Sequence, residues 1–80
     1  MRLPADFPQQ IAPPKFRDGH RIHWLPITNE EIECGTIIGH AFAYAHHRRQ
    51  WTWQYLVWLD APHRGTLTDT AWEDDLELLP

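Results

Sequence analysis

Between residues 50 and 60 the chain alternates bulky apolar positions with more polar ones, in the longest run of strand-forming residues of the sequence. Side chains along a β-strand point to alternate faces of the sheet, so residues of one parity share a face. We therefore predict a strand whose odd positions face a core and whose even positions are half exposed, with the large Trp58 as an exception on the half-exposed face. The predicted core-facing residues are Trp51, Trp53, Tyr55, Val57 and Leu59, and the half-exposed ones are Thr52, Gln54, Leu56 and Trp58.

Four other segments have the composition of short strands, and turn-forming residues separate them. Gly35 and Gly39 inside the second strand segment indicate bends or bulges. The strands are expected at residues 20–25, 33–44, 66–72 and 76–79. The connections are expected at Asp18-Gly19, at residues 28–31 as an acidic loop, at residues 45–50 as a polar loop, at residues 60–65, and at residues 73–75 as a tight acidic turn open to 3₁₀ geometry.

Prolines mark the N-terminal part of the chain as different from the rest. Proline fixes φ and has no amide proton, so we expect residues 1–16 to form an extended Pro-rich arm that cannot join a central strand. The arm could lie ordered on residues 17–80, the expected folded domain, or be a mobile tail. The four prolines are Pro4, Pro8, Pro13 and Pro14, and the apolar residues that could hold the arm in place are Leu3, Phe7, Ile11 and Phe16.

Length and composition limit the possible folds. A chain of 80 residues forms one small domain, whose core must be compact and filled by large side chains. Five Trp, three Phe and two Tyr supply such side chains. The single cysteine excludes an internal disulfide and favours a reducing, cytoplasmic setting. The sequence has no run of apolar residues long enough to span a membrane, so we expect no membrane insertion.

The order of elements predicts an all-β protein, a small five-stranded SH3-like barrel. Three segments carry a resemblance to SH3-like barrel proteins over residues 17–79: Gly35-Thr36-Ile37-Ile38-Gly39, Tyr55-Leu56-Val57-Trp58-Leu59-Asp60 and Trp72-Glu73-Asp74-Asp75-Leu76-Glu77-Leu78. Small accessory subunits of photosynthetic electron-transfer complexes have similar segments. Among them are the photosystem I reaction-centre subunit IV, the variable chain of ferredoxin–thioredoxin reductase and a ferredoxin-docking subunit of the photosynthetic NADH-dehydrogenase-like complex. Tudor and KOW modules are similar in outline. The resemblance implies the fold more than the function, because its positions are mostly core and turn positions.

Enzymatic chemistry and metal binding have little support in the sequence. The chain has no serine, and Cys34 lies between Glu33 and Gly35 with no neighbour that would activate its thiol. Although there are six histidines, His20 and His23 would point to opposite faces of a strand and cannot share an ion. We expect no catalytic residue, no cofactor and no metal site.

The polar loop at residues 45–50 and its aromatic flanks are the candidate interaction site. Basic side chains beside aromatic ones suit single-stranded nucleic acid, and Trp, Tyr and Arg also dominate protein interfaces. The net charge of −4, with five acidic and no basic residues among the last fifteen, favours a protein partner. The predicted partner-binding residues are Tyr44, His46, His47, Arg48, Arg49, Trp51 and Trp58.

We thus predict a non-enzymatic protein-interaction or accessory-subunit module. Its arginines would pair with an acidic partner and its aromatic side chains would provide buried anchor area. Under the resemblance to photosynthetic subunits, the partner would be an acidic electron-transfer protein or a larger complex. The alternatives are a nucleic-acid-binding module that uses the same loop, and a solvated hairpin tip with no direct role. The sequence leaves the oligomeric state open.

Overall fold

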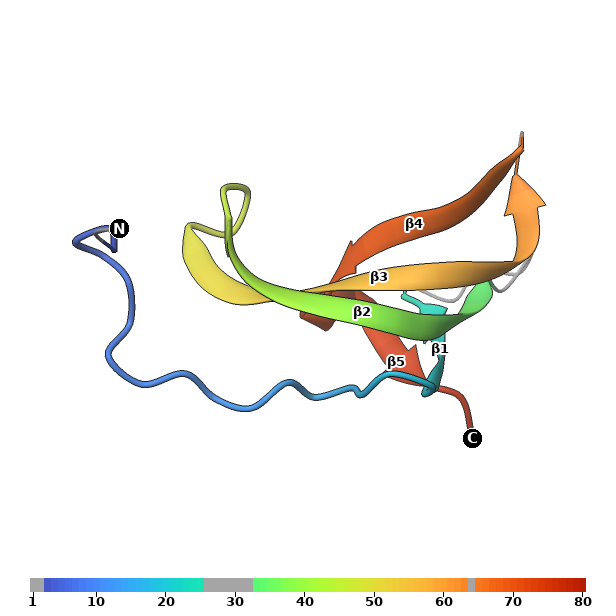
Figure 1. Cartoon of the computed structure of the whole chain (residues 1–80), viewed down its shortest axis with the longest axis horizontal. Helices are drawn as coiled ribbons and strands as arrows, with labels where there is room; N and C mark the ends of the chain where they lie inside the picture. The colour runs from blue at the N-terminus through green and yellow to red at the C-terminus, as the bar shows by residue number, and fades with distance from the viewer. Residues whose placement is uncertain (1–2, 26–32, 64) are drawn as a thin grey trace.

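The computed structural model describes residues 3–25, 33–63 and 65–80, and these form one antiparallel sheet of five strands (Figure 1). The acidic loop expected at residues 28–31 lies outside the described residues. Within them there is no α-helix, and hence no helix long and apolar enough to cross a membrane. The elements are β1 (Arg21–Trp24), β2 (Cys34–Ala45), β3 (Gln50–His63), β4 (Thr66–Trp72), the 3₁₀ turn η1 (Glu73–Asp75) and β5 (Leu76–Leu78).

The strand order is β4-β3-β2-β1-β5, so β4 and β5 are the two edges of the sheet. The all-β prediction with five strands is confirmed, but the sheet is not closed into a barrel. Closure requires the two edge strands to pair. Within the described residues β4 pairs with β3 alone, and β5, three residues long, pairs with β1 alone. The turn η1 carries the chain from one edge to the other without bringing the two strands together.

A bulge in β2 decides which residues face the core. The register shifts between Ile37, which pairs with Val57, and Gly39, which pairs with Leu56, so that Ile38 is an extra residue. Before the bulge, one face of β2 carries the odd-numbered Ile37. Because of the extra residue, the same face carries the even-numbered residues of β2 after the bulge. We call this face, which also holds Tyr55 and Val57, the inner face, and the opposite one the outer face. A bulge at this place was expected from Gly39.

The core lies against the inner face. Its fully buried large side chains belong to Phe16, Ile22, Ile37, Tyr55, Val57 and Leu76. Each such side chain contributes about 1.5–3 kcal/mol through its removal from water. The predicted alternation of β3 is confirmed, since Tyr55 and Val57 are buried and Trp53 and Leu59 pack against the core, while Leu56 and Trp58 are exposed.

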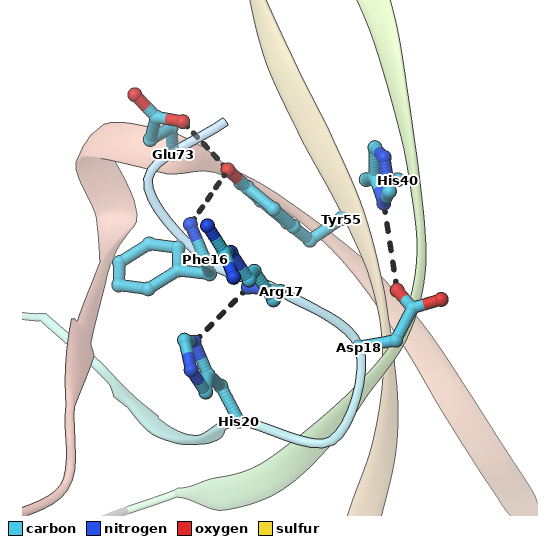
Figure 2. A network of polar contacts seen from close by, with 7 residues as sticks. All are labelled: Phe16, Arg17, Asp18, His20, His40, Tyr55 and Glu73. Atoms are coloured by element: carbon cyan, nitrogen blue, oxygen red, sulfur yellow. Dashed lines mark hydrogen bonds and ion pairs between the residues drawn. The ribbon is translucent and has the colours of Figure 1, made fainter. Parts of the chain in front are cut away.

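Residues 15–20 tie the start of the chain to this core (Figure 2). The Tyr55 hydroxyl accepts a hydrogen bond from the Phe16 amide (3.2 Å) and donates one to Glu73 Oε2 (2.6 Å). The Lys15 amide donates to the same carboxylate oxygen at 3.0 Å. The backbone of Gly19 donates to the carbonyl of Ile37 at 2.7 Å. Phe16, expected at the end of the arm, is thus a core residue.

The second half of β3 departs from the prediction. A turn was expected over residues 60–65, yet β3 continues to His63, which pairs with Thr66. The ladder with β4 is irregular between Trp58 and His63. Pro62 falls in this irregular stretch, where its missing amide proton costs no ladder hydrogen bond.

Candidate interaction surfaces

The β2–β3 hairpin carries an aromatic patch on its inner face, formed by Phe42, Tyr44, Trp51 and Trp53. The register places Phe42 opposite Trp53 and Tyr44 opposite Trp51, and side chains directly opposite on one face are in contact. The ring centroids of Phe42 and Trp53 are 5.2 Å apart, and those of Tyr44 and Trp51 are 5.7 Å apart. Edge-to-face packing of this kind favours the hairpin beyond its buried area.

The tip of the hairpin is a tight turn over residues 46–49. The amides of Arg48 and Arg49 donate to the carbonyls of Ala45 (3.1 Å) and His46 (3.3 Å). Arg49 closes the turn with a φ of 53°, a left-handed conformation that is uncommon for a residue with a side chain. The His46 ring packs edge-on against Tyr44 with 5.0 Å between centroids, so His46 extends the aromatic patch towards the tip.

The basic charge of the loop is partly neutralised within the chain. Arg48 donates to Asp74 Oδ2 at 2.8 Å and to Asp75 Oδ1 at 3.1 Å, which places the loop over η1. The His47 ring lies 5.7 Å from the ring of Trp72, on the same side. Among the described residues Arg49 has no ion-pair partner. Arg48 was predicted to pair with an acidic partner. Such a partner would have to compete with the carboxylates that already bind Arg48 and hold the hairpin to the end of β4.

Trp58 lies apart from the loop. It pairs with Thr36 and Thr68, in the second half of β3, and its side chain is on the outer face, 48 % exposed. Leu56, its neighbour on the same face, is 38 % exposed. Beside Leu56 the outer face has a shallow hollow of about 240 Å³. The residues that line the hollow are Gly39, His40, Ala41, Gln54, Tyr55, Leu56 and Thr70.

The seven predicted residues therefore occupy four places. Tyr44, His46 and Trp51 belong to the inner face of the hairpin, His47 and Arg48 contact the region of Trp72 and η1, and Trp58 belongs to the outer face. Arg49 is at the tip. Sequence reasoning named Phe7 only as a residue that could hold the arm in place and did not predict its packing on Trp51. It also missed the small residues Gly39 and Ala41 of the hollow. A signal for Phe7 existed, because it is an aromatic residue between two prolines.

The ionisable groups with shifted pKa values are structural. Hydrogen bonds from Arg21 lower the pKa of Asp60, and the same bonds raise the pKa of Arg21. Arg21 Nη1 is 2.6 Å from Asp60 Oδ1 and 2.9 Å from Thr36 Oγ1. Burial, together with the hydrogen bond to Glu73, raises the pKa of Tyr55. In the described ranges no group of three or more His, Cys, Asp or Glu side chains could hold a metal ion.

Comparison of the chain with protein-family models, curated proteins and solved structures found no match. The resemblance to SH3-like barrels therefore stays a prediction.

Proposed function

We propose that the protein is a non-enzymatic docking module that binds a protein partner through the outer face of β2, β3 and β4, with Trp58 as the anchor. The observation that carries this proposal is the 48 % exposure of Trp58 beside the exposed Leu56. Large apolar side chains grouped on a surface favour association, and Trp is among the residues that contribute most to protein interfaces.

The surroundings of Trp58 suit an apolar side chain of a partner. The register sets Gly39, Leu56 and Thr70 side by side across three strands, next to the row of Thr36, Trp58 and Thr68. Because Gly39 has no side chain, Leu56 borders a hollow rather than another side chain. Hydroxyl groups around the hollow can exchange water for polar groups of a partner, as at the rim of an interface.

The charges favour protein over nucleic acid. Arg21, whose register position is on the outer face next to Thr36, is already bound by Asp60, and Arg48 is bound by Asp74 and Asp75. Phosphate binding needs cations that are free to replace counterions. A nucleic acid that used Arg21 on the outer face or Arg48 in the loop would have to break one of these intramolecular pairs, whereas an apolar anchor would not.

The SH3-like assignment and the accessory-subunit role are part of the same proposal. The strand order, the bulge in β2 and the 3₁₀ turn before β5 support an SH3-like layout, although the sheet is open. A cytoplasmic location, expected from the single cysteine, belongs to the proposal as well.

The test compares Trp58→Ala with Leu67→Ala. Leu67 is a matched control, because it is 49 % exposed and belongs to the same sheet. It is next to Thr68, which shares the face of Trp58, and by the alternation of strand side chains it belongs to the other face. Proteins captured by the wild-type chain are identified, purified and titrated against each variant. We expect Trp58→Ala to weaken binding by about 2 kcal/mol, roughly 30-fold, and Leu67→Ala by less than about 3-fold.

Salt separates the two ligand classes. An apolar anchor should lose little affinity between about 50 and 200 mM salt, whereas binding to phosphates should fall steeply and log-linearly. A single-stranded oligonucleotide that binds with such a slope, or a partner that binds Trp58→Ala as well as the wild type, would reject the proposal.

A further inference from the structure

The aromatic patch of the hairpin is covered by the chain itself, through its N-terminal segment (residues 3–14). The Phe7 ring packs edge-on against Trp51, with 4.7 Å between centroids, and against Phe42 at 5.8 Å. Further along the segment, the indole Nε1 of Trp53 donates to the carbonyl of Ala12 at 2.8 Å. The segment therefore runs beside β3 in the same direction, with Phe7 at Trp51 and Ala12 at Trp53.

These contacts are few compared with those that follow them in the chain. Residues 15–20 are held by a buried ring and several backbone hydrogen bonds, as Figure 2 shows for Phe16. Between Phe7 and Ala12, by contrast, Gln9 and Gln10 are exposed and Ile11 is 43 % exposed. A segment with few buried contacts opens locally far more often than the core unfolds. The N-terminal segment is thus anchored at its end near Phe16 and weakly held over the patch.

The segment leaves one donor of the patch unsatisfied. Trp51 Nε1 is buried, and no acceptor for it exists within the described residues. Trp53, two residues further along the same face, has the Ala12 carbonyl. A buried donor without an acceptor is unfavourable, because it has lost its hydrogen bonds to water. A ligand that offered carbonyls to both indoles would fit the patch better than the chain's own segment does.

We propose that the aromatic patch is a second docking surface, for an extended, proline-containing segment of a partner protein with an aromatic side chain, and that the N-terminal segment occupies this surface until the partner displaces it. The chemistry of the occupant follows from what occupies the patch now. Prolines at positions 8, 13 and 14 disfavour helix and strand pairing in residues 8–14. The Phe7 amide donates to the Pro4 carbonyl at 3.0 Å in a turn, but within the described structure no hydrogen bond between backbone groups involves residues 8–14, so their carbonyls are available to indole donors.

This surface is distinct from the outer face around Trp58, so the inference goes beyond the proposed function and does not depend on it. The N-terminal segment and a partner segment compete unequally for the patch, because the N-terminal segment, being part of the same chain, is present at an effective concentration in the millimolar range. A partner segment lacks this covalent link to the sheet. To displace the N-terminal segment it must therefore gain binding energy elsewhere, and a hydrogen bond from the Trp51 indole, which the N-terminal segment does not accept, can provide it. Removing Phe7 should uncover the patch for a free peptide.

The experiment follows the indole N–H signals of Trp51 and Trp53 by NMR in the full-length chain. It compares the wild type with Phe7→Ala and with Ile11→Ala, a control that removes an exposed apolar side chain of the same segment. The probe is a synthetic peptide of residues 3–14. We expect Phe7→Ala to shift the Trp51 signal and to bind the peptide at least about tenfold more tightly than the wild type and Ile11→Ala do.

Two further peptides test the chemistry of the ligand. A peptide with alanine in place of Phe7 should not bind, and one with alanine in place of its prolines should bind at least about fivefold more weakly. Phe7→Leu, which keeps an apolar side chain but no ring, serves as a milder variant in case Phe7→Ala disturbs the core signals of Ile22 and Val57. It should bind the probe with intermediate affinity.

Three results would overturn the inference. An unchanged Trp51 signal in Phe7→Ala would mean that Phe7 does not cover the patch. A peptide that leaves both indole signals of this variant unchanged at millimolar concentration would mean that the uncovered patch binds no such segment. A wild-type chain that is dimeric, and monomeric once Phe7 is removed, would make the occupant a second copy instead of a partner.

Discussion

Two glycines in β2 provide a sharp test of the sheet, because the space around them differs. A Cβ added to Gly35 would lie 2.4 Å from Val57 Cγ1 and 2.6 Å from the carbonyl oxygen of Trp58. At Gly39 the nearest atom would be Leu56 Cβ at 3.7 Å, which is an ordinary contact. Gly35→Ala and Gly39→Ala therefore make the same chemical change in one strand with opposite steric consequences.

The magnitudes follow from these distances. Carbon atoms pack optimally at about 3.5–4.0 Å, so β2 and β3 would have to separate by about 1 Å at Gly35. Since a backbone oxygen is involved, we expect a cost at the upper end of the overpacking range, about 3 kcal/mol. For a domain of this size that lowers the melting temperature by about 12–24 °C. Gly39→Ala should instead stabilise the chain by about 0.4–1 kcal/mol, because alanine restricts the unfolded chain.

The assay is urea unfolding followed by tryptophan fluorescence, with the free energy of unfolding extrapolated to water for the wild type and both variants. An unchanged dependence on urea concentration shows that only stability has changed. Equal effects of the two substitutions, within about 0.5 kcal/mol, would contradict the close approach of β2 and β3 at Gly35 and with it the assigned register.

Three further outcomes concern polar contacts. Tyr55→Phe removes the acceptor of the buried Phe16 amide and should lower the free energy of unfolding by about 1–3 kcal/mol. Tyr44→Phe, whose hydroxyl has no hydrogen bond within the described residues, should change it by less than about 0.5 kcal/mol. Burial raises the pKa of Tyr55 above 10.0, so the folded chain holds this proton more tightly than the unfolded chain does. The stabilisation is therefore present below about pH 10 and lost above it, and melting temperatures should fall more steeply there for the wild type than for Tyr55→Phe. The pKa of Asp60 is lowered by Arg21, so the advantage of the wild type over Asp60→Asn should be present above about pH 4 and disappear as the pH falls through the lowered value. Because both side chains are exposed, we expect that advantage to be small and to shrink with added salt; an advantage that grew towards low pH would contradict the ion pair.

Local signals were enough to place most of the elements. The alternation in residues 50–60 identified the inner face of β3, and Thr66–Trp72 coincides with the segment predicted as a strand. The acidic turn at Glu73–Asp75 is a 3₁₀ turn, as its composition suggested. These features depend on the parity of side chains and on turn chemistry, both of which act within a few residues. The candidate site was less predictable, because Arg48 binds carboxylates 26 and 27 residues away.

The sequence by itself determined that this chain forms an all-β fold of five strands, one of them rich in Trp. Only the tertiary structure decided that the sheet stays open, that Arg48 pairs with the carboxylates of η1, and that Phe7 covers the aromatic patch. The physical reason is the range of the interactions. Strand formation follows from neighbours along the chain, whereas pairing of edge strands and docking of a remote segment depend on contacts between residues that are distant in the sequence.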